Sequence, residues 1–332
     1  MTKRPTDMPE RPDHADDALT ELFRAVRFTR CIYYTMQGVP PAPPIHVPEG
    51  TAIAGGLGAR TRTVLSYHVI VEGSLFTGLE TGDVVKLEAG DVVVYPRGDT
   101  YFLAHANGGF PPADDPAKLR DLLAGVASGA LPPAFVFGDG ENRMRVVCGF
   151  LGCDPRPFDP LLEALPRMLH VKRIDGRLKD LVDLALANAD GVGAASVRER
   201  LSESMFIETV RRHVEHLAPE RAGWLGGLHD PIVGRALALM HADLAATWTL
   251  ASLAKKCAAS RSVLAERFTK LVGQPPMQYL ARARMQTAAQ LLRRRGATVA
   301  EIARDVGYES EAAFSRAFKK AHGVAPSDLI LS

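Results

Sequence analysis

The 332-residue chain has 46% hydrophobic residues, enough to fill two ordinary domain cores, and a formal net charge of only +2. It has no run of about 18 apolar residues, so the sequence argues against a membrane span. Residues 1–17 are charged and Pro-rich, so we expect a disordered tail there and no secretory signal.

The charge is distributed unevenly along the chain. From His229 to the end there are 15 Lys and Arg residues against 8 Asp and Glu residues, a net charge of +7, whereas the preceding part carries −5. A basic C-terminal third predicts that any nucleic-acid-binding surface lies there, although many solvated helical surfaces are also basic.

The cysteines indicate a reducing compartment. There are four, and none stands in a CxxC zinc pattern: Cys31, Cys148, Cys153 and Cys257. Without a secretory signal, reduced thiols and a cytoplasmic location are expected.

The part of the chain between Ile45 and Phe150 has short, β-rich apolar runs separated by Gly and Pro. The clearest are Val64–Glu72, Val84–Leu87, Val92–Tyr95 and Arg145–Gly149. These runs predict an antiparallel all-β domain. A Pro-, Gly- and Asp-rich excursion over 107–133 interrupts it and contains a short helix near 118–127.

Helical spacing of apolar residues begins after Pro160. One face holds Leu178, Leu181, Val182 and Ala185, and a second stripe holds Val197, Leu201, Met205, Val210, Val214 and Leu217. We expect the second helix to pair two subunits, with packing against its own β domain as the alternative. The Gly-rich stretch 218–228 is expected to be a linker, and Asp230–Pro231 to begin the next helix, with Asp as the cap and Pro at the first position.

An internal repeat occupies the C-terminal third. Leu250–Phe268 and Val299–Phe318 match at apolar and small positions, with the second turn one residue longer. Each copy predicts a short helix, a turn and a second helix whose apolar stripe is Leu264/Phe268 or Phe314/Phe318. Thr298 with Glu301 predicts a capping box, and Gly307 permits the second turn. A long helix over 276–295, ended by Gly296, should join the two units.

The opposite face of each second helix is expected to be exposed. These faces hold Arg261, Ser262, Ala265, Glu266 and Thr269 in the first unit, and Glu311, Ala312, Ser315, Arg316 and Lys319 in the second. Two such helices tied by a rigid helix can enter successive major grooves on one side of DNA, about 34 Å apart. A plain helical bundle with solvated polar faces is the alternative, and the tandem repeat with its matching caps argues against it.

The repeat resembles the AraC/XylS signature. The resemblance rests on Ser260, Leu264, Phe268, Gly273, Pro275, Tyr279, Leu280 and Arg284 in the first half, and on Ile302, Ala303, Val306, Gly307, Tyr308, Phe314, Ser315, Arg316, Phe318, Lys319, Gly323 and Pro326 in the second. It covers residues 229–331, with a loose match at Met285, Ala288 and Ala289. The resemblance implies sequence-specific promoter binding and, usually, activation through RNA polymerase contact.

The β-rich part resembles a cupin barrel of the type attached to some AraC-like regulators, over residues 17–171. The resemblance rests on Ser66–Gly73 and Gly90–Gly98, and further on 147–149 and 161–166. In metal-binding cupins, His and Glu hold the ion, but the matching positions here are Ser66, Arg60, Arg62 and Tyr101. This set lacks good metal ligands, so no metal is expected and a metal-dependent enzyme is disfavoured.

Two inputs to the β domain remain open. Strand alternation puts Ser66, His68 and Ile70 on one face, so His68 could line an effector pocket with Ser66 and Tyr101; a satisfied core histidine is the alternative. His46 and His105 are expected in exposed loops. The second input is thiol oxidation at Cys148 and Cys153, near Arg145 or Arg156, with Cys31 as a third participant; buried, inert cysteines are the alternative.

The sequence therefore predicts an α+β chain of two domains. A disordered tail over 1–17 precedes a cupin-like β-barrel sensor over 18–171, a helical linker and dimerisation region over 172–220, and an all-α tandem helix-turn-helix domain over 229–332. The predicted function is a non-enzymatic, cytoplasmic, homodimeric DNA-binding regulator controlled by a small molecule or by thiol oxidation. The alternatives are a cupin enzyme with a regulatory DNA-binding tail and a constitutive DNA-binding protein.

Overall fold

The computed structural model describes residues 19–20, 23, 26, 28–38, 44–105, 111–137, 144–153, 160–187, 193–217, 223–228, 230–292 and 298–330. The chain divides into two compact units. A β-rich unit contains 26–155 and 165–216, and a helical unit contains 1–25, 156–164 and 217–332. The expected tail over 1–17 and the helix end at Gly296 lie outside the described residues.

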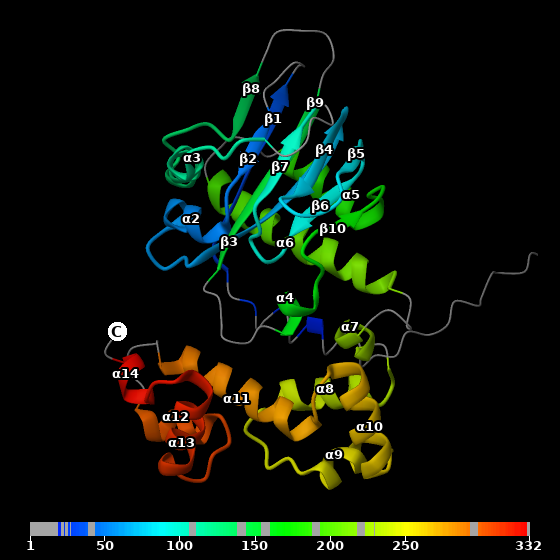
Figure 1. Ribbon diagram of the computed structural model, residues 1–332, viewed down its shortest axis with the longest axis vertical. Helices are drawn as coiled ribbons and strands as arrows, with labels where there is room; N and C mark the ends of the chain where they lie inside the picture. The colour runs from blue at the N-terminus through cyan, green and yellow to red at the C-terminus, as the bar shows by residue number, and fades with distance from the viewer. Residues whose placement is uncertain are drawn as a thin grey trace, which may run out of the picture. The chain divides into compact units, whose positions relative to one another are not determined.

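Two sheets build the β-rich unit (Figure 1). The larger has the strand order β10 (Leu169–Val171), β6 (Val92–Tyr95), β3 (Thr63–Glu72), β9 (Met144–Cys153), β1 (Phe28–Gly38) and β8 (Ala134–Phe137). The smaller has the order β2 (Ile45–Val47), β7 (Tyr101–Ala104), β4 (Ser74–Leu79) and β5 (Val85–Glu88).

The predicted all-β domain is confirmed, with three differences. The described strands form a two-sheet sandwich and not the expected closed barrel. β1 lies before the expected start at Ile45, and it pairs with nearly the whole of β9. β8 runs parallel to β1, whereas the other described pairs are antiparallel. The long connection before β8, which includes the helix in the 107–133 excursion, lets β8 run parallel to β1.

Side-chain alternation decides what each sheet face contacts. On β3, Val64, Ser66, His68 and Ile70 point into the sandwich, and Tyr67 points to the outer face. Tyr67 pairs with Gly149 on β9, where a Cβ atom would lie 1.9 Å from the tyrosine ring. Glycine at 149 therefore lets the Tyr67 ring cross the neighbouring strand and reach the helix beyond it.

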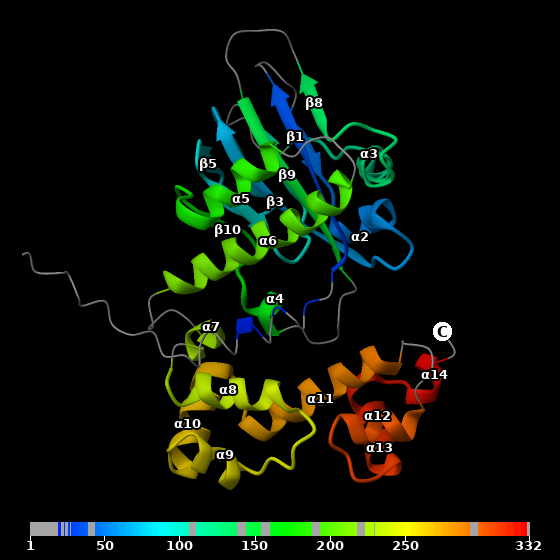
Figure 2. The ribbon, with the colours of Figure 1, turned by 180° about the vertical axis from the view of Figure 1, so that it is seen from behind.

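Helices cover this unit outside the sheets. They are α2 (Gly50–Ile53), the 3-10 helix η1 (Ala54–Leu57), α3 (Pro116–Ser128), α5 (Gly176–Ala187) and α6 (Ala194–Glu215). α3 confirms the helix expected near 118–127; Asp115 caps it and Pro116 occupies its first position. α5 and α6 pack together, and α6 lies across the six-stranded sheet (Figure 2).

The apolar stripe of α6 faces its own sheet. Leu201, Met205, Val210 and Val214 are buried, whereas Val197 is 43% exposed. The Ser202 hydroxyl, on the same face, donates a 3.0 Å hydrogen bond to the Ile32 carbonyl and receives one from Tyr67. The expectation that this stripe pairs two subunits is therefore wrong, because the sheet already buries it. Helical periodicity indicates an apolar face without naming its partner.

Asp91 ties the segment after β10 to the turn between β5 and β6. Its carboxylate accepts hydrogen bonds from the backbone N–H groups of Glu88 and Arg173, both at 3.2 Å, and lies 3.0 Å from His170 Nε2. Burial raises the pKa of Asp91, but these hydrogen bonds outweigh the burial effect and leave the pKa lowered. The ionised carboxylate therefore helps to hold the start of α5 in place.

The helical unit contains α4 (Pro160–Ala164), α7 (Gly223–Gly227), α8 (Val233–Ala242), α9 (Leu250–Lys256), α10 (Arg261–Val272), α11 (Pro276–Leu292), α12 (Val299–Asp305), α13 (Glu311–His322) and α14 (Pro326–Ile330). The expected linker over 218–228 is partly wrong, because 223–227 is helical. The described helices include none that is long and apolar enough to cross a bilayer.

Asp230 lies just before the next helix, α8, which begins two residues later than expected. Its Oδ1 atom accepts hydrogen bonds from the Ile232 and Val233 N–H groups, each at 3.0 Å. Asp230 therefore orders the turn before α8, but the N-cap of the helix is Ile232, so the expected N-cap position is wrong. The regular helix starts at Val233, after a turn that contains Pro231, so Pro231 is not its first residue.

Candidate functional site

The first helix-turn-helix unit consists of α9 and α10. A capping box begins α9, where Thr249 accepts a hydrogen bond from the Ser252 N–H and Ser252 accepts one from the Thr249 N–H. Sequence reasoning missed this box because Ser replaces the usual Glu or Gln. Ala258 turns the chain at φ 53°, and Ser260 caps α10 through the Val263 N–H.

The second unit, α12 and α13, repeats this construction. The predicted capping box of Thr298 and Glu301 is confirmed, and Gly307 turns the chain at φ 80°. Ser310 caps α13 through the Ala313 N–H, as Ser260 caps α10. The two units therefore place their second helices by the same local rules.

The predicted stripes of both second helices are buried. Leu264, Phe268, Phe314 and Phe318 have no exposed surface, and small buried Ala residues at 254 and 303 let the helices cross closely. Burial of one face fixes which face of α10 and α13 is left outward.

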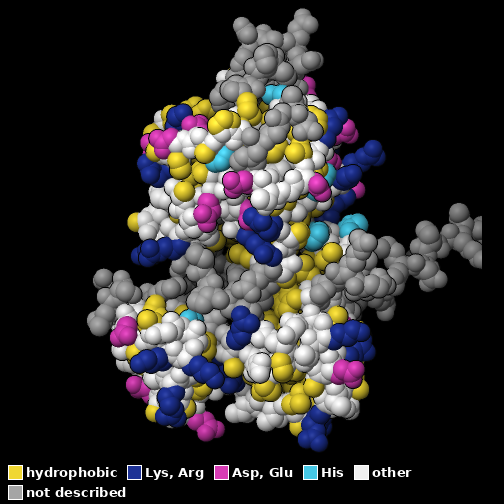
Figure 3. Space-filling view, viewed as in Figure 1, with side chains coloured by type: hydrophobic (Ala, Val, Ile, Leu, Met, Phe, Trp, Pro, Cys, Tyr) yellow, Lys and Arg dark blue, Asp and Glu magenta, His cyan; other side chains and the backbone are white. Residues whose placement is uncertain are grey.

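The ten residues predicted to face DNA lie on that outward side. Eight are exposed, and Ala265 and Ser315 are half-buried. Further exposed cations lie at Lys255, Lys256, Lys270 and Lys320, and Lys and Arg side chains are spread over the visible face of this unit (Figure 3). The chemistry fits a duplex, because guanidinium groups read guanine edges and ammonium groups bind phosphates.

Arg267 has a different task from the other exposed arginines. Its guanidinium pairs with Asp230 Oδ2, while Oδ1 of the same carboxylate orders the turn before α8. This pairing holds α10 against the start of α8, so Arg267 does not belong to the outward-facing set.

The connecting helix α11 is shared by the two units. Its first part packs on the first unit, where the Tyr279 hydroxyl lies 2.7 Å from His241 Nε2 and its ring 5.6 Å from the Phe268 ring. Burial lowers the pKa of His241 to about 4, so this histidine is neutral at pH 7. Its last part supplies Met285, Ala288, Ala289 and Leu292 to the core of the second unit. The loosely matched residues of the family signature are thus core residues.

In the β-rich unit, the structure brings the predicted pocket residues together. His68 Nε2 lies 2.5 Å from the Tyr101 hydroxyl, which also hydrogen-bonds to Ser66. His68 is 1% exposed, and burial lowers its pKa to about 3, so its ring is neutral. Its Nδ1 atom has no hydrogen-bond partner among the described residues, so the alternative of a satisfied core histidine holds for only one ring nitrogen.

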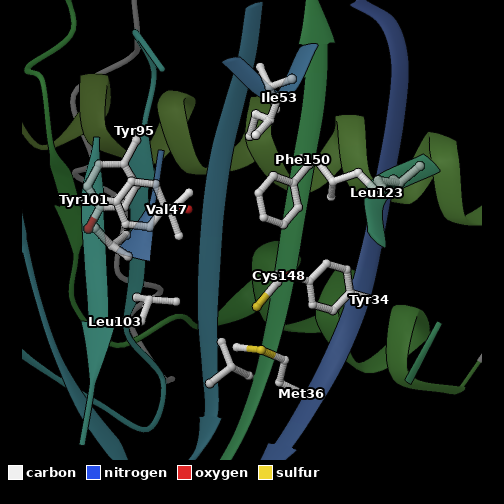
Figure 4. Packing of buried hydrophobic residues seen from close by; sticks show 14 of the residues in the cluster. Tyr34, Met36, Val47, Ile53, Tyr95, Tyr101, Leu103, Leu123, Cys148 and Phe150 are labelled. Carbon is white, nitrogen blue, oxygen red and sulfur yellow. The ribbon is translucent and has the colours of Figure 1, made fainter. Parts of the chain in front are cut away.

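Further contacts beside His68 join the two sheets. The Tyr95 and Tyr101 rings stack with centroids 3.6 Å apart, and the Tyr95 hydroxyl lies 2.5 Å from Thr77 Oγ1 (Figure 4). Tyr95 belongs to the larger sheet, and Thr77 and Tyr101 to the smaller. Side chains from β1 and β9, among them Tyr34, Phe150 and Cys148, belong to the same buried core as Tyr95 and Tyr101. A ligand or substitution at His68 would therefore alter contacts in both sheets.

The cupin metal positions do not fit a metal in this chain. Tyr101 is engaged with both Ser66 and His68, and Arg60 and Arg62 are exposed. Within the described ranges, no three His, Cys, Asp or Glu side chains are grouped as metal ligands. The donor set is that of a hydrogen-bonding site.

The cysteines proposed for redox sensing are free and buried. Cys148 and Cys153 lie on one strand with opposite parity, about 16 Å apart at the rise of a strand, so a disulfide between them requires β9 to open. Burial raises the pKa of the Cys148 thiol, and burial followed by Glu203 and Glu199 raises that of Cys31. These features disfavour reactive thiolates, and thiol oxidation stays a prediction to be tested.

Two histidines at the edge of the sandwich, His46 and His105, are less exposed than expected. His46 lies within β2, and His105 directly follows β7, and each is half-buried. The expected loop position is wrong for His46 and right for His105, and neither is fully exposed.

Comparison with known proteins covers both units. The family model described as Cupin matches residues 17–215, and the model described as Helix-turn-helix domain matches 253–330. A putative AraC-like transcription regulator of Streptomyces lividans is 40% identical over 58% of this chain and 64% of its own length. The HTH-type transcriptional regulator AlkR of Acinetobacter baylyi is 30% identical over 78% of this chain and 85% of its own length.

A solved structure also matches the C-terminal part. The DNA-binding domain of AdpA, in complex with a target DNA, is 27% identical, with a TM-score of 0.30, over 31% of this chain and 91% of that one. The chain spans slightly less than two thirds of the length of the Streptomyces relatives.

With a cupin region over more than half of its length and a paired helix-turn-helix region after it, the chain belongs to the family of AraC-type transcription regulators with a cupin N-terminal domain.

Proposed function

We propose that this chain regulates transcription by placing α10 and α13 in two successive major grooves of promoter DNA. One observation carries the proposal: two similarly capped helices, each with a buried stripe and an outward polar face, are joined by one shared helix. α11 has 17 residues, about 25 Å at the rise of a helix, and so separates the two units along its length. DNA contacts, to bases or to phosphates, are assigned to the outward-facing residues of α10 and α13.

The β-rich unit is proposed to sense a small molecule near His68 and Tyr101. The buried Nδ1 atom of His68 lacks a partner, and a ligand with a complementary hydrogen-bonding group would satisfy it. The contacts of His68 and its neighbours join the two sheets, so ligand binding can favour one arrangement of the sandwich over another. Only such a differential effect can change DNA affinity.

Oxidation of Cys148 and Cys153 is the competing input, and one pair of variants separates the two. A reporter gene is followed in cells carrying the wild type, a double Cys→Ser variant or His68→Ala, with hydrogen peroxide or with a metabolite panel added. A metabolite response that is lost in His68→Ala and kept in the double variant supports the pocket. A peroxide response that only the double variant loses shows that the cysteines are the sensor.

The partners follow from promoter binding. We propose a cytoplasmic homodimer that binds double-stranded DNA, contacts RNA polymerase and activates transcription without catalysing a reaction. The apolar stripe of α6 is buried against its own sheet, so we place the dimer surface elsewhere. Sedimentation of the full chain with and without its DNA tests the dimer, and in vitro transcription with purified polymerase tests activation.

A further inference from the structure

The two helix-turn-helix units are connected at more than one place. The covalent connection is α11, which carries Tyr279 in the first core and Met285 in the second. Because Arg284 immediately precedes Met285, it lies on α11 where the first core gives way to the second. The orientation of α13 relative to α10 therefore depends on α11 and on any further contact between the two units.

Arg284 makes the second connection. It is half-buried, its Nε atom donates to the Leu244 carbonyl and its Nη2 atom donates to the Ala246 carbonyl, both at 2.7 Å. Both carbonyls belong to the loop between α8 and α9, in the first unit. A planar guanidinium can hold two carbonyls in fixed directions, which a lysine ammonium cannot do.

The same guanidinium touches the turn of the second unit. Its carbon lies 6.0 Å from the centre of the Tyr308 ring. At the neighbouring Gly307, a Cβ atom would lie 2.6 Å from the Ala245 carbonyl oxygen and 2.8 Å from Arg284 Nη2. The loop of the first unit, the connecting helix and the turn of the second unit thus meet at one point.

The loop that Arg284 holds is itself ordered by local bonds. Asp243 Oδ1 accepts hydrogen bonds from the Ala245 and Ala246 N–H groups, at 3.1 and 3.0 Å, and the Trp248 indole donates to the Asp243 carbonyl at 2.8 Å. Capping residue Thr249 follows directly and begins α9. Because these bonds order the loop, the contacts of Arg284 fix the start of α9 relative to the turn before α13.

We propose that Arg284 is a positioning residue that fixes the second recognition helix relative to the first and thereby sets the spacing between the two DNA half-sites. Arg284 affects DNA binding only by orienting α13, because its guanidinium contacts the loop between α8 and α9 and the turn before α13. The inference rests on the proposed two-groove binding.

The test compares Arg284→Met and Arg284→Lys with the wild type and with Arg282→Met. Arg282 is exposed on the same helix, so its replacement is a matched loss of one guanidinium. The probes are a duplex selected by the wild-type full chain from a random-sequence library, derivatives with one base pair inserted or removed between its half-sites, and duplexes that keep one half-site. One inserted base pair moves the second half-site by about 3.4 Å and turns it by about 35°.

The wild type and Arg282→Met should lose at least about tenfold in affinity on insertion of one base pair. For Arg284→Met, the same insertion should cost less than about threefold, with single half-site affinity unchanged; Arg284→Lys should lie between. Circular dichroism checks that each variant is folded. If Arg284→Met is unfolded, the insertion penalty of Arg284→Lys tests the proposal. An undiminished insertion penalty, or equal weakening on every duplex, would overturn the proposal. Selection of a single half-site by the wild type would instead overturn two-groove binding itself.

Discussion

Replacing Arg316 with alanine removes an exposed guanidinium from the outward face of α13, between the buried Phe314 and Phe318. The fold should be unaffected, because alanine favours a helix and Arg316 lies outside the buried stripe. A guanidinium that binds a guanine edge with two hydrogen bonds contributes about 1–3 kcal/mol of discrimination at one base pair. This corresponds to a loss of about 5- to 150-fold in affinity for the selected duplex.

Two companion variants give this result its meaning. Lys319→Ala removes an exposed ammonium one turn away, which is expected to contact phosphate. It should weaken binding to all sequences alike and reduce the slope of log affinity against log salt by about one. Arg267→Ala removes a guanidinium that is engaged by Asp230, so it should change stability more than base preference.

The assay is fluorescence anisotropy on the selected duplex and on the three duplexes that replace each base pair of the α13 half-site. Arg316→Ala should bind all four bases at one position almost equally and keep the wild-type preference elsewhere. If Arg316→Ala weakens every duplex by the same factor, Arg316 binds only phosphate and the assignment of α13 as a base-reading helix at this residue is wrong.

Three further outcomes test the β-rich unit. Tyr101→Phe should lower the free energy of unfolding by about 1–3 kcal/mol in urea titrations, because it leaves the buried His68 ring without its hydroxyl partner; an unchanged midpoint would contradict this. Leu201→Glu should abolish the cooperative unfolding transition, since it puts a carboxylate against the sheet, whereas Val197→Glu should leave it intact; a folded Leu201→Glu monomer would restore α6 as a dimer surface. The lowered pKa of Asp91 means that its contribution is present above the ordinary carboxyl pKa and is lost as pH falls through the folded value. The stability difference between the wild type and Asp91→Asn should therefore be constant above about pH 5 and shrink below about pH 4, and a difference that grows on acidification would refute it.

The helical unit was predictable because its signals are local. Caps such as Thr298 and Ser310 lie within three residues of the N–H groups they satisfy, and stripes such as Phe314/Phe318 repeat every turn. Because the unit is repeated, the interpretation of each copy could be compared with that of the other. The misses in this unit were small: the helix at 223–227, the Thr249–Ser252 capping box, and the start of α8, where a turn that contains Pro231 precedes the helix.

What sequence reasoning missed depends on contacts between distant residues. The stripe of α6 was visible, but its partner was not, because periodicity is the same whether a sheet or a second subunit covers it. Strand β1 was not foreseen, although it pairs with β9 along its length in the larger sheet. The role of Arg284 was equally hidden, since its partners lie about 40 residues before it and about 24 after it.

Hydroxyl-radical footprinting of the full chain on its selected duplex tests the central claim most directly. Two recognition helices in successive major grooves predict two protected patches per bound chain, centred about 10 base pairs apart on one face of the duplex. Ala substitutions at Arg261 and at Arg316 should each remove one patch and leave the other. A single protected patch, or two patches that vanish together in either variant, would contradict the account.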